Sequence, residues 1–161
     1  MQLANQTFYF VLFSTFIGLL ASFLWAHQAQ KTQFSSLYWP LGLGAYAISA
    51  LCFFLSPWLG KVNLAIANLA LLFGALSICI LFNVWSHALN KAKLLFAIFW
   101  FFLITASYVY LLNFGSTNER IHLMNLAIGI TSIWQISILL HLHKTDSSYQ
   151  IKLLILADSI Q

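Results

Sequence analysis

Charged side chains are scarce in this sequence. Only 6% of the 161 residues are charged, whereas 61% are hydrophobic. The charged residues are the acidic Glu119, Asp146 and Asp158 and the basic Lys31, Lys61, Lys91, Lys93, Arg120, Lys144 and Lys152. So few charges could not cover the surface of a water-soluble domain, so the composition predicts a chain embedded in a lipid bilayer. The basic residues form no cluster, and a nucleic-acid partner is therefore not expected.

Motifs that carry chemistry are also lacking. The sequence has no glycine-rich phosphate loop, no H-E-x-x-H, no C-x-x-C, no nucleophile elbow and no pair of carboxylates. Its two cysteines, Cys52 and Cys79, lie inside apolar runs, where reduced structural thiols are expected. We therefore predict no enzymatic activity, no catalytic residue, no metal site and no cofactor for these residues.

Long uncharged apolar runs, by contrast, recur along the chain. A helix needs about 20 apolar residues to cross a hydrocarbon core of roughly 30 Å. Windows of this kind cover about 8–25, 38–58, 62–85, 94–112 and 121–142, and a partial segment covers 151–161. The runs lack period-2 alternation, and an open sheet would leave unpaired backbone groups in lipid. The predicted fold is a single all-α domain over 1–161, a polytopic transmembrane bundle of five complete spans and a truncated sixth.

Residues at the ends of these windows support their placement. Pro40 falls in the first turn of the second window, where its missing N–H has no cost, and Pro57 with Gly60 marks the exit. With the N-terminus outside, five basic residues are cytoplasmic and only two, Lys61 and Arg120, are external. This excess predicts an N-out orientation. Tryptophans stand at four window ends, at Trp25, Trp39, Trp58 and Trp85.

Small residues recur at helical spacing in two of the windows. They are Gly42, Ala45 and Ser49 in the second window and Ala67, Ala70, Gly74 and Ser77 in the third. Small side chains let two helix backbones approach closely in lipid. We expect these stripes to pack helices of the same chain together, and a homodimer through the same faces is the alternative.

Three amide side chains lie in apolar surroundings, Asn68, Asn125 and Gln135. A buried amide left without a partner in hydrocarbon costs several kcal/mol, so we expect hydrogen bonds between helices. The alternative is a ligand-contacting face, on which Asn125 would stand with Gly129 and Ser132. The five windows contain no Asp, Glu, Lys or Arg, and an ion-coupled pump is therefore disfavoured.

Polar residues gather in the segment from Ser116 to His122. Glu119 stands at the entry of the fifth window, where the positive end of a helix dipole favours a carboxylate. Arg120 can reach headgroup phosphates or a loop carbonyl. We interpret the segment as a helix cap, and a signal-receiving role is the alternative.

Histidines lie near the predicted cytoplasmic helix ends, at His27, His87, His141 and His143. Two imidazoles on facing helices can hold a haem, and clustered histidines can bind a metal. His141 and His143 are two positions apart and point to different helix faces, which disfavours a joint site. We interpret these residues as interfacial polar groups.

Three segments carry a resemblance to a known group of proteins. They read Y-W-P-L-G-L-G-A-Y-A-I at Tyr38–Ile48, A-N-L-A-L-L-F-G-A-L at Ala67–Leu76 and N-E-R-I-H-L-M-N-L at Asn118–Leu126. With the helices placed as above, the pattern resembles the N-terminal membrane region found ahead of GGDEF diguanylate cyclase domains, and sometimes histidine kinase domains, in bacterial signalling proteins. The resemblance implies a multi-pass sensor module of roughly seven helices in the bacterial inner membrane, joined to a cytoplasmic output domain.

The present sequence departs from that plan. It ends inside what would be the sixth helix and contains no G-G-D-E-F residues, so we expect a fragment without cyclase activity. The functional hypothesis is a membrane-embedded sensory input region whose ligand the sequence does not identify. The alternative is a stand-alone small membrane protein, an accessory subunit or a transporter-like bundle that associates through its small-residue stripes.

Overall fold

The fold is an all-α bundle, as the sequence predicts. The computed structural model describes residues 2–29, 37–86 and 89–145, with side chains at 6–25, 37–86 and 89–142. It has four helices in this part of the chain, which are α1 (Gln2–Ala29), α2 (Tyr38–Trp85), α3 (Lys91–Phe114) and α4 (Thr117–Thr145). All four are long and apolar enough to cross a membrane.

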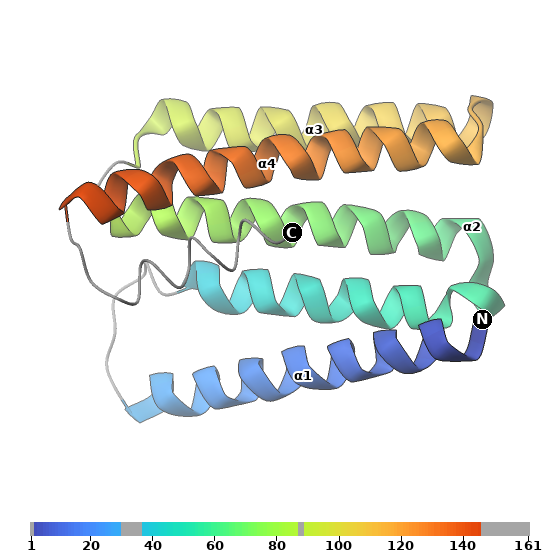
Figure 1. Cartoon of the computed structure of the whole chain (residues 1–161), viewed down its shortest axis with the longest axis horizontal. Helices are drawn as coiled ribbons and strands as arrows, with labels where there is room; N and C mark the ends of the chain where they lie inside the picture. Colours follow the sequence, from blue (N-terminus) through green and yellow to red (C-terminus); the bar gives the residue numbers. More distant parts are fainter. Residues whose placement is uncertain (1, 30–36, 87–88, 146–161) are drawn as a thin grey trace.

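Helix α2 is a hairpin rather than a straight rod (Figure 1). Gly60 has φ 74° and ψ −157°, a backbone conformation that glycine adopts far more easily than other residues. Its two legs, residues 38–59 and 61–85, therefore run back along each other. The rings of Trp39 and Trp85, near the open end of the hairpin, have centroids 6.5 Å apart. Across the bend, the Asn63 side chain donates a hydrogen bond to the Cys52 carbonyl.

The hairpin corrects one part of the sequence prediction. The structure has four helices where five separate ones are predicted, because the windows at 38–58 and 62–85 are the two legs of α2. Pro57 lies inside the first leg and does not mark its exit. Proline lacks the N–H that would donate to the carbonyl four residues earlier, that of Phe53. The Ser56 hydroxyl donates to this carbonyl instead, at 2.8 Å, so the helix continues as far as Gly60.

The other windows fall within longer helices. The helices α1, α3 and α4 enclose 8–25, 94–112 and 121–142, and extend beyond them through polar residues. In α3 the extension has a clear cause, since the Asn90 side chain accepts a hydrogen bond from the Lys93 backbone N–H at 2.9 Å and caps the helix. Pro40 is in the first turn of α2, as predicted. The partial segment 151–161 lies outside the described residues.

The legs and helices lie roughly side by side, with α1 at one edge of the view, α3 at the other, and the two legs of α2 between them (Figure 1). The second leg of α2 shares a buried core with α3 and α4, made up of Ala65, Leu72, Leu76, Ala97, Ile104, Tyr108, Met124 and Ala127. A second cluster of Cys79, Phe82, Ile138 and Leu139 joins the second leg to α4. Helix α1 packs on α2 alone among the described helices. None of the α1 side chains at 6–25 is buried.

Candidate functional site

The two legs of α2 meet at a seam of small residues. A Cβ atom added to Gly74 would lie 2.8 Å from the Tyr46 ring and 3.2 Å from the Gly42 carbonyl oxygen. A Cβ atom added to Gly42 would lie 2.7 Å from the Ile78 side chain and 3.4 Å from the Gly74 carbonyl oxygen. The two glycines therefore bring the two backbones together within one chain.

The other residues of the predicted stripes lie on the same two legs. Ala45, Ser49, Ala67 and Ser77 are buried, and Ala70 is half-buried. The hydroxyl of Ser77 donates to the Phe73 carbonyl of its own helix, at 2.9 Å. Within these stripes, Gly42 and Gly74 pack the two legs against each other, whereas Ala45 and Ala70 also line a groove described below.

Two of the predicted amides make hydrogen bonds between helices. The Asn68 side chain on the second leg donates to the Tyr108 hydroxyl oxygen of α3, at 2.9 Å. The buried Gln135 side chain of α4 donates to the Ala75 carbonyl of the second leg, at 2.7 Å. Together they tie α3 and α4 to the same leg of α2. The third predicted amide, Asn125 of α4, is exposed and has a different setting.

Asn125 and Asn68 both line a cavity of about 580 Å³. This central cavity lies between α1, both legs of α2 and α4, and its wall consists of Tyr9, Leu12, Phe16, Tyr46, Ser49, Ala50, Phe53, Asn68, Leu71, Ala75, Asn125 and Ile128. Its volume falls in the range typical of small-molecule sites. It has a few polar groups among aromatic and aliphatic side chains, and this is the composition such sites usually have.

Helix α1 closes the central cavity with aromatic side chains. Tyr9 stacks on Phe53, with ring centroids 5.1 Å apart and an interplanar angle of 20°. Phe16 contacts Tyr46 at 5.4 Å. Contacts of this kind are worth about 0.5–1.5 kcal/mol per pair beyond the area they bury. The wall formed by α1 therefore contacts the first leg through aromatic rings, and none of the α1 side chains at 6–25 is buried.

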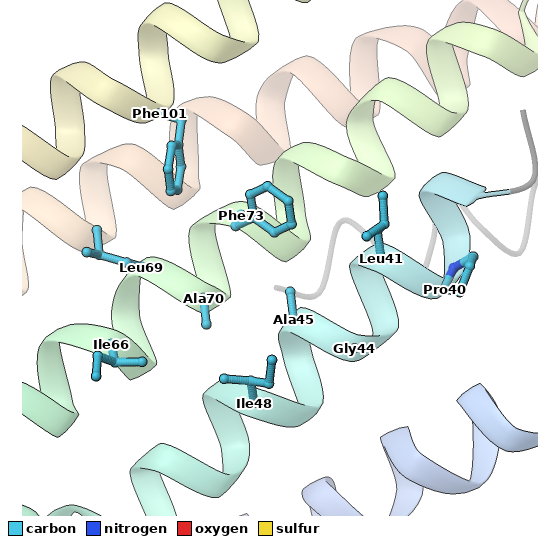
Figure 2. A pocket seen from close by; sticks show the side chains of 10 residues that line it. All are labelled: Pro40, Leu41, Gly44, Ala45, Ile48, Ile66, Leu69, Ala70, Phe73 and Phe101. Carbon is cyan, nitrogen blue, oxygen red and sulfur yellow. The ribbon is translucent and has the colours of Figure 1, made fainter.

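A second cavity, of about 430 Å³, is lined by both legs of the hairpin and by Phe101 of α3 (Figure 2). This apolar groove is lined by Pro40, Leu41, Gly44, Ala45, Ile48, Ile66, Leu69, Ala70, Phe73 and Phe101. Figure 2 shows Ala45 and Ala70 on the two legs, with Phe73 and Phe101 beside them. No side chain in its wall can donate or accept a strong hydrogen bond, so the groove can recognise only apolar groups.

The segment from Ser116 to His122 caps α4. Glu119 accepts hydrogen bonds from the Ser116 backbone N–H at 2.6 Å and from the Ser116 hydroxyl at 2.9 Å. Both hydrogen bonds lower the pKa of Glu119, and the bond from the backbone N–H has the larger effect. Glu119 lies before the apolar part of α4. Arg120 is buried and donates to the Ser116 carbonyl at 3.3 Å and to the Thr117 hydroxyl at 2.9 Å. Glu119 therefore forms a capping box with Ser116, whose hydroxyl accepts from the Glu119 backbone N–H at 3.3 Å, and Arg120 hydrogen-bonds within the same segment.

One polar contact at the other end of the bundle was not anticipated. Asn83 is fully buried and accepts a hydrogen bond from the Lys93 ammonium of α3 at 3.0 Å. Its amide nitrogen donates to the Cys79 carbonyl, also at 3.0 Å. The available signal in the sequence is that Asn83 lies two residues before the end of the window at 62–85. The partner could be found only from the way in which α3 packs against the hairpin.

The predicted histidine and cysteine positions provide no metal centre in the described part of the chain. No three His, Cys, Asp or Glu residues come together among the residues described. His141 is exposed, whereas His87 and the side chains of His27 and His143 lie outside the described residues. Neither Cys52 nor Cys79 takes part in a disulfide, and Cys79 is buried in the second core cluster.

Comparison with known proteins adds no relative to this picture. No protein-family model, no curated protein and no solved structure matches the chain.

Proposed function

We propose that this chain is the membrane-embedded input region of a bacterial signalling protein, with no catalytic activity of its own. The observation that carries the proposal is the central cavity. It is lined by α1, which packs on α2 alone among the described helices, and by the hairpin and α4. An occupant of the cavity would contact both α1 and the hairpin against which α1 packs. Its binding could then favour one packing of α1 over another, which is what an input region must do.

The proposal includes five membrane crossings, one for each leg of α2 and one for each remaining helix. A straight helix of 48 residues would be about 72 Å long at 1.5 Å per residue, more than twice a hydrocarbon core of about 30 Å. Each leg alone has the length of one crossing. Large apolar side chains point outward along the bundle, for example Phe99 at 63% and Phe102 at 65% exposure on α3. Lipid would cover these side chains in the inner membrane, with the N-terminus outside.

The output that we propose is a C-terminal diguanylate cyclase-type domain, beyond the present 161 residues. The support is the resemblance of the segments Tyr38–Ile48, Ala67–Leu76 and Asn118–Leu126 to membrane regions that precede such domains. The test is to read the gene beyond Gln161 and to express the full reading frame with and without the membrane part. A signalling domain whose product formation depends on the membrane part supports the proposal. A reading frame without a signalling domain overturns it.

The second candidate is a stand-alone membrane protein that acts as an accessory subunit or a transporter-like bundle. It is favoured by the apolar groove in Figure 2, where Gly44, Ala45 and Ala70 would let a partner helix approach closely. A Cβ atom added to Gly44 would meet no heavy atom within 4 Å, so this part of the groove has room. A stop codon directly after Gln161 favours this candidate over the input region.

A further inference from the structure

Two properties of the central cavity restrict what it can hold. First, its wall contains no Asp, Glu, Lys, Arg or His side chain. A charged group placed there would lose its hydration without gaining an ionic partner, and this is strongly unfavourable. Second, four aromatic rings contribute to the wall, at Tyr9, Phe16, Tyr46 and Phe53. The occupant must therefore be neutral and mainly apolar.

The third restriction comes from Asn68. Both hydrogens of its amide nitrogen are used, one by the Leu64 carbonyl at 3.0 Å and one by the Tyr108 hydroxyl oxygen at 2.9 Å. Its Oδ1 atom accepts no hydrogen bond from any residue that the structure describes. It is also not among the polar atoms that are fully buried without a partner, so part of its surface is accessible. An amide oxygen with free capacity in a cavity wall can accept a hydrogen bond from an occupant, so the occupant needs a donor.

The amide of Asn125 lies at a similar depth on another wall. Asn68 is eight residues from Gly60 and Asn125 is eight residues from Thr117, or about 12 Å along each helix at 1.5 Å per residue. The bend at Gly60 and the turn before Thr117 lie at the same end of the bundle (Figure 1). The two amides therefore form one polar level in a wall that also includes the hydroxyl-bearing residues Tyr9, Tyr46 and Ser49.

We propose that the central cavity binds a neutral amphiphile, an alkyl chain with one hydroxyl group, of the class of long-chain alcohols and acylglycerols. The hydroxyl group donates to Asn68 Oδ1 and pairs with the Asn125 amide, and the alkyl chain lies against the aromatic rings of α1 and the hairpin. In the described residues, no Cα atom of α1 comes within 8 Å of a Cα atom of α4, although both helices line the cavity. The amphiphile enters from the lipid through the gap between α1 and α4.

The amphiphile is the ligand class that we infer for the proposed input region. The inference rests on the proposed function in one respect, that the bundle lies in a membrane. It is tested by binding to the purified full chain in phosphatidylcholine nanodiscs, so a failure of signalling does not affect it. The probe is a photoreactive octanol with a diazirine group, and labelled peptides are identified by mass spectrometry. We expect labelling of residues 9–16, 46–53, 68–75 and 125–128, and competition by n-octanol.

Two competitors and three variants make the test specific. Octanoate, which is charged at pH 8, and octyl methyl ether, which has no donor, should each compete at least threefold more weakly than n-octanol. The variants Asn68→Leu and Asn125→Leu should each weaken competition by n-octanol roughly threefold to tenfold, the effect of one neutral hydrogen bond. Because Asn125 is exposed, we expect Asn125→Leu to fold. The test can therefore still be carried out if Asn68→Leu does not fold. The control is Asn113→Leu, an exposed amide of α3 away from the cavity, which should change nothing.

Labelling spread evenly over all lipid-facing helices, with no competition by n-octanol, would overturn the proposal. Equal competition by octanoate would also overturn it, because the cavity would then accept a charge. Equal effects of Asn113→Leu and Asn125→Leu would show that Asn125 does not hydrogen-bond to the occupant, and would overturn the proposed role of the two amides.

Discussion

The first leg of α2 is packed differently on its two sides. Toward the second leg, Gly42 and Gly74 bring two backbones so close that an added Cβ atom would lie 3.2 Å from a carbonyl oxygen. Toward α1, the contact is made by side-chain rings such as Tyr9 and Phe53, whose centroids are 5.1 Å apart. Backbones in close contact permit one arrangement, whereas rings can turn and repack. Because α1 packs on α2 alone among the described helices and none of its side chains at 6–25 is buried, we expect a rearrangement of the bundle at α1, where the central cavity lies.

The largest effect is expected from filling the glycine seam. Gly74→Leu should destabilise the bundle by about 1–3 kcal/mol, because the added side chain meets the Tyr46 ring and the other leg. The matched control is Gly44→Leu on the same hairpin, where an added Cβ atom meets nothing within 4 Å. Thermal unfolding in detergent measures both variants. Equal losses would mean that the seam is not the rigid contact of the hairpin.

The next effect tests the contact between α1 and the hairpin. A double-mutant cycle of Tyr9→Leu and Phe53→Leu should give a coupling energy of about 0.5–1.5 kcal/mol, as expected for a stacked aromatic pair. Hydrogen exchange should become faster in α1 and remain unchanged in α3, because α1 packs on α2 alone among the described helices. If exchange rises equally in α1 and α3, then the two parts unfold together and the comparison fails.

A smaller effect is expected at the hydrogen bond between Asn68 and Tyr108. A double-mutant cycle of Asn68→Leu and Tyr108→Phe should give about 0.6 kcal/mol, the average for polar contacts between membrane helices. The unfolding midpoint of the four proteins provides the measurement. A coupling near zero would show that Tyr108 does not hold the amide, and would weaken the assignment of Oδ1 as the free acceptor.

The smallest effect concerns the cap of α4. The hydrogen bonds from Ser116 lower the pKa of Glu119 below its ordinary value of 4.5. A carboxylate with a lowered pKa in the folded state contributes stability above pH 4.5, and this contribution is lost as the pH falls through the lowered pKa. Compared with the original chain, Glu119→Gln should therefore lose part of the acid sensitivity of the unfolding temperature. Identical pH profiles would show that the cap contributes nothing measurable.

The helices could be predicted from the sequence because their causes are local. Uncharged runs of the required length and the first-turn Pro40 place helical segments inside α1, α2, α3 and α4. The joining of the windows at 38–58 and 62–85 into one helical hairpin could not be predicted. The helix continues past Pro57, where the Ser56 hydroxyl donates to the Phe53 carbonyl, and only Gly60 leaves the helical conformation.

The candidate site could be predicted only in part. Asn68, Asn125 and Gln135 attract attention because amides are rare in apolar runs, yet their partners depend on how neighbouring helices are aligned. The rings of Tyr9 and Tyr46 could not be singled out, since 17% of the sequence is aromatic. A cavity is a property of the packing of α1, α2 and α4 together, and no local pattern records it.

The most direct test of the account is the side of the membrane on which the turns lie. Lys61, Lys91 and Asn118 are exposed, and each can be replaced by cysteine and treated in intact cells with a membrane-impermeant maleimide. Five crossings with the N-terminus outside predict that residues 61 and 118 react from outside and that residue 91 reacts only after the cells are opened. Reaction of residues 61 and 91 from the same side would contradict the account, because the second leg of α2 would then not cross the membrane.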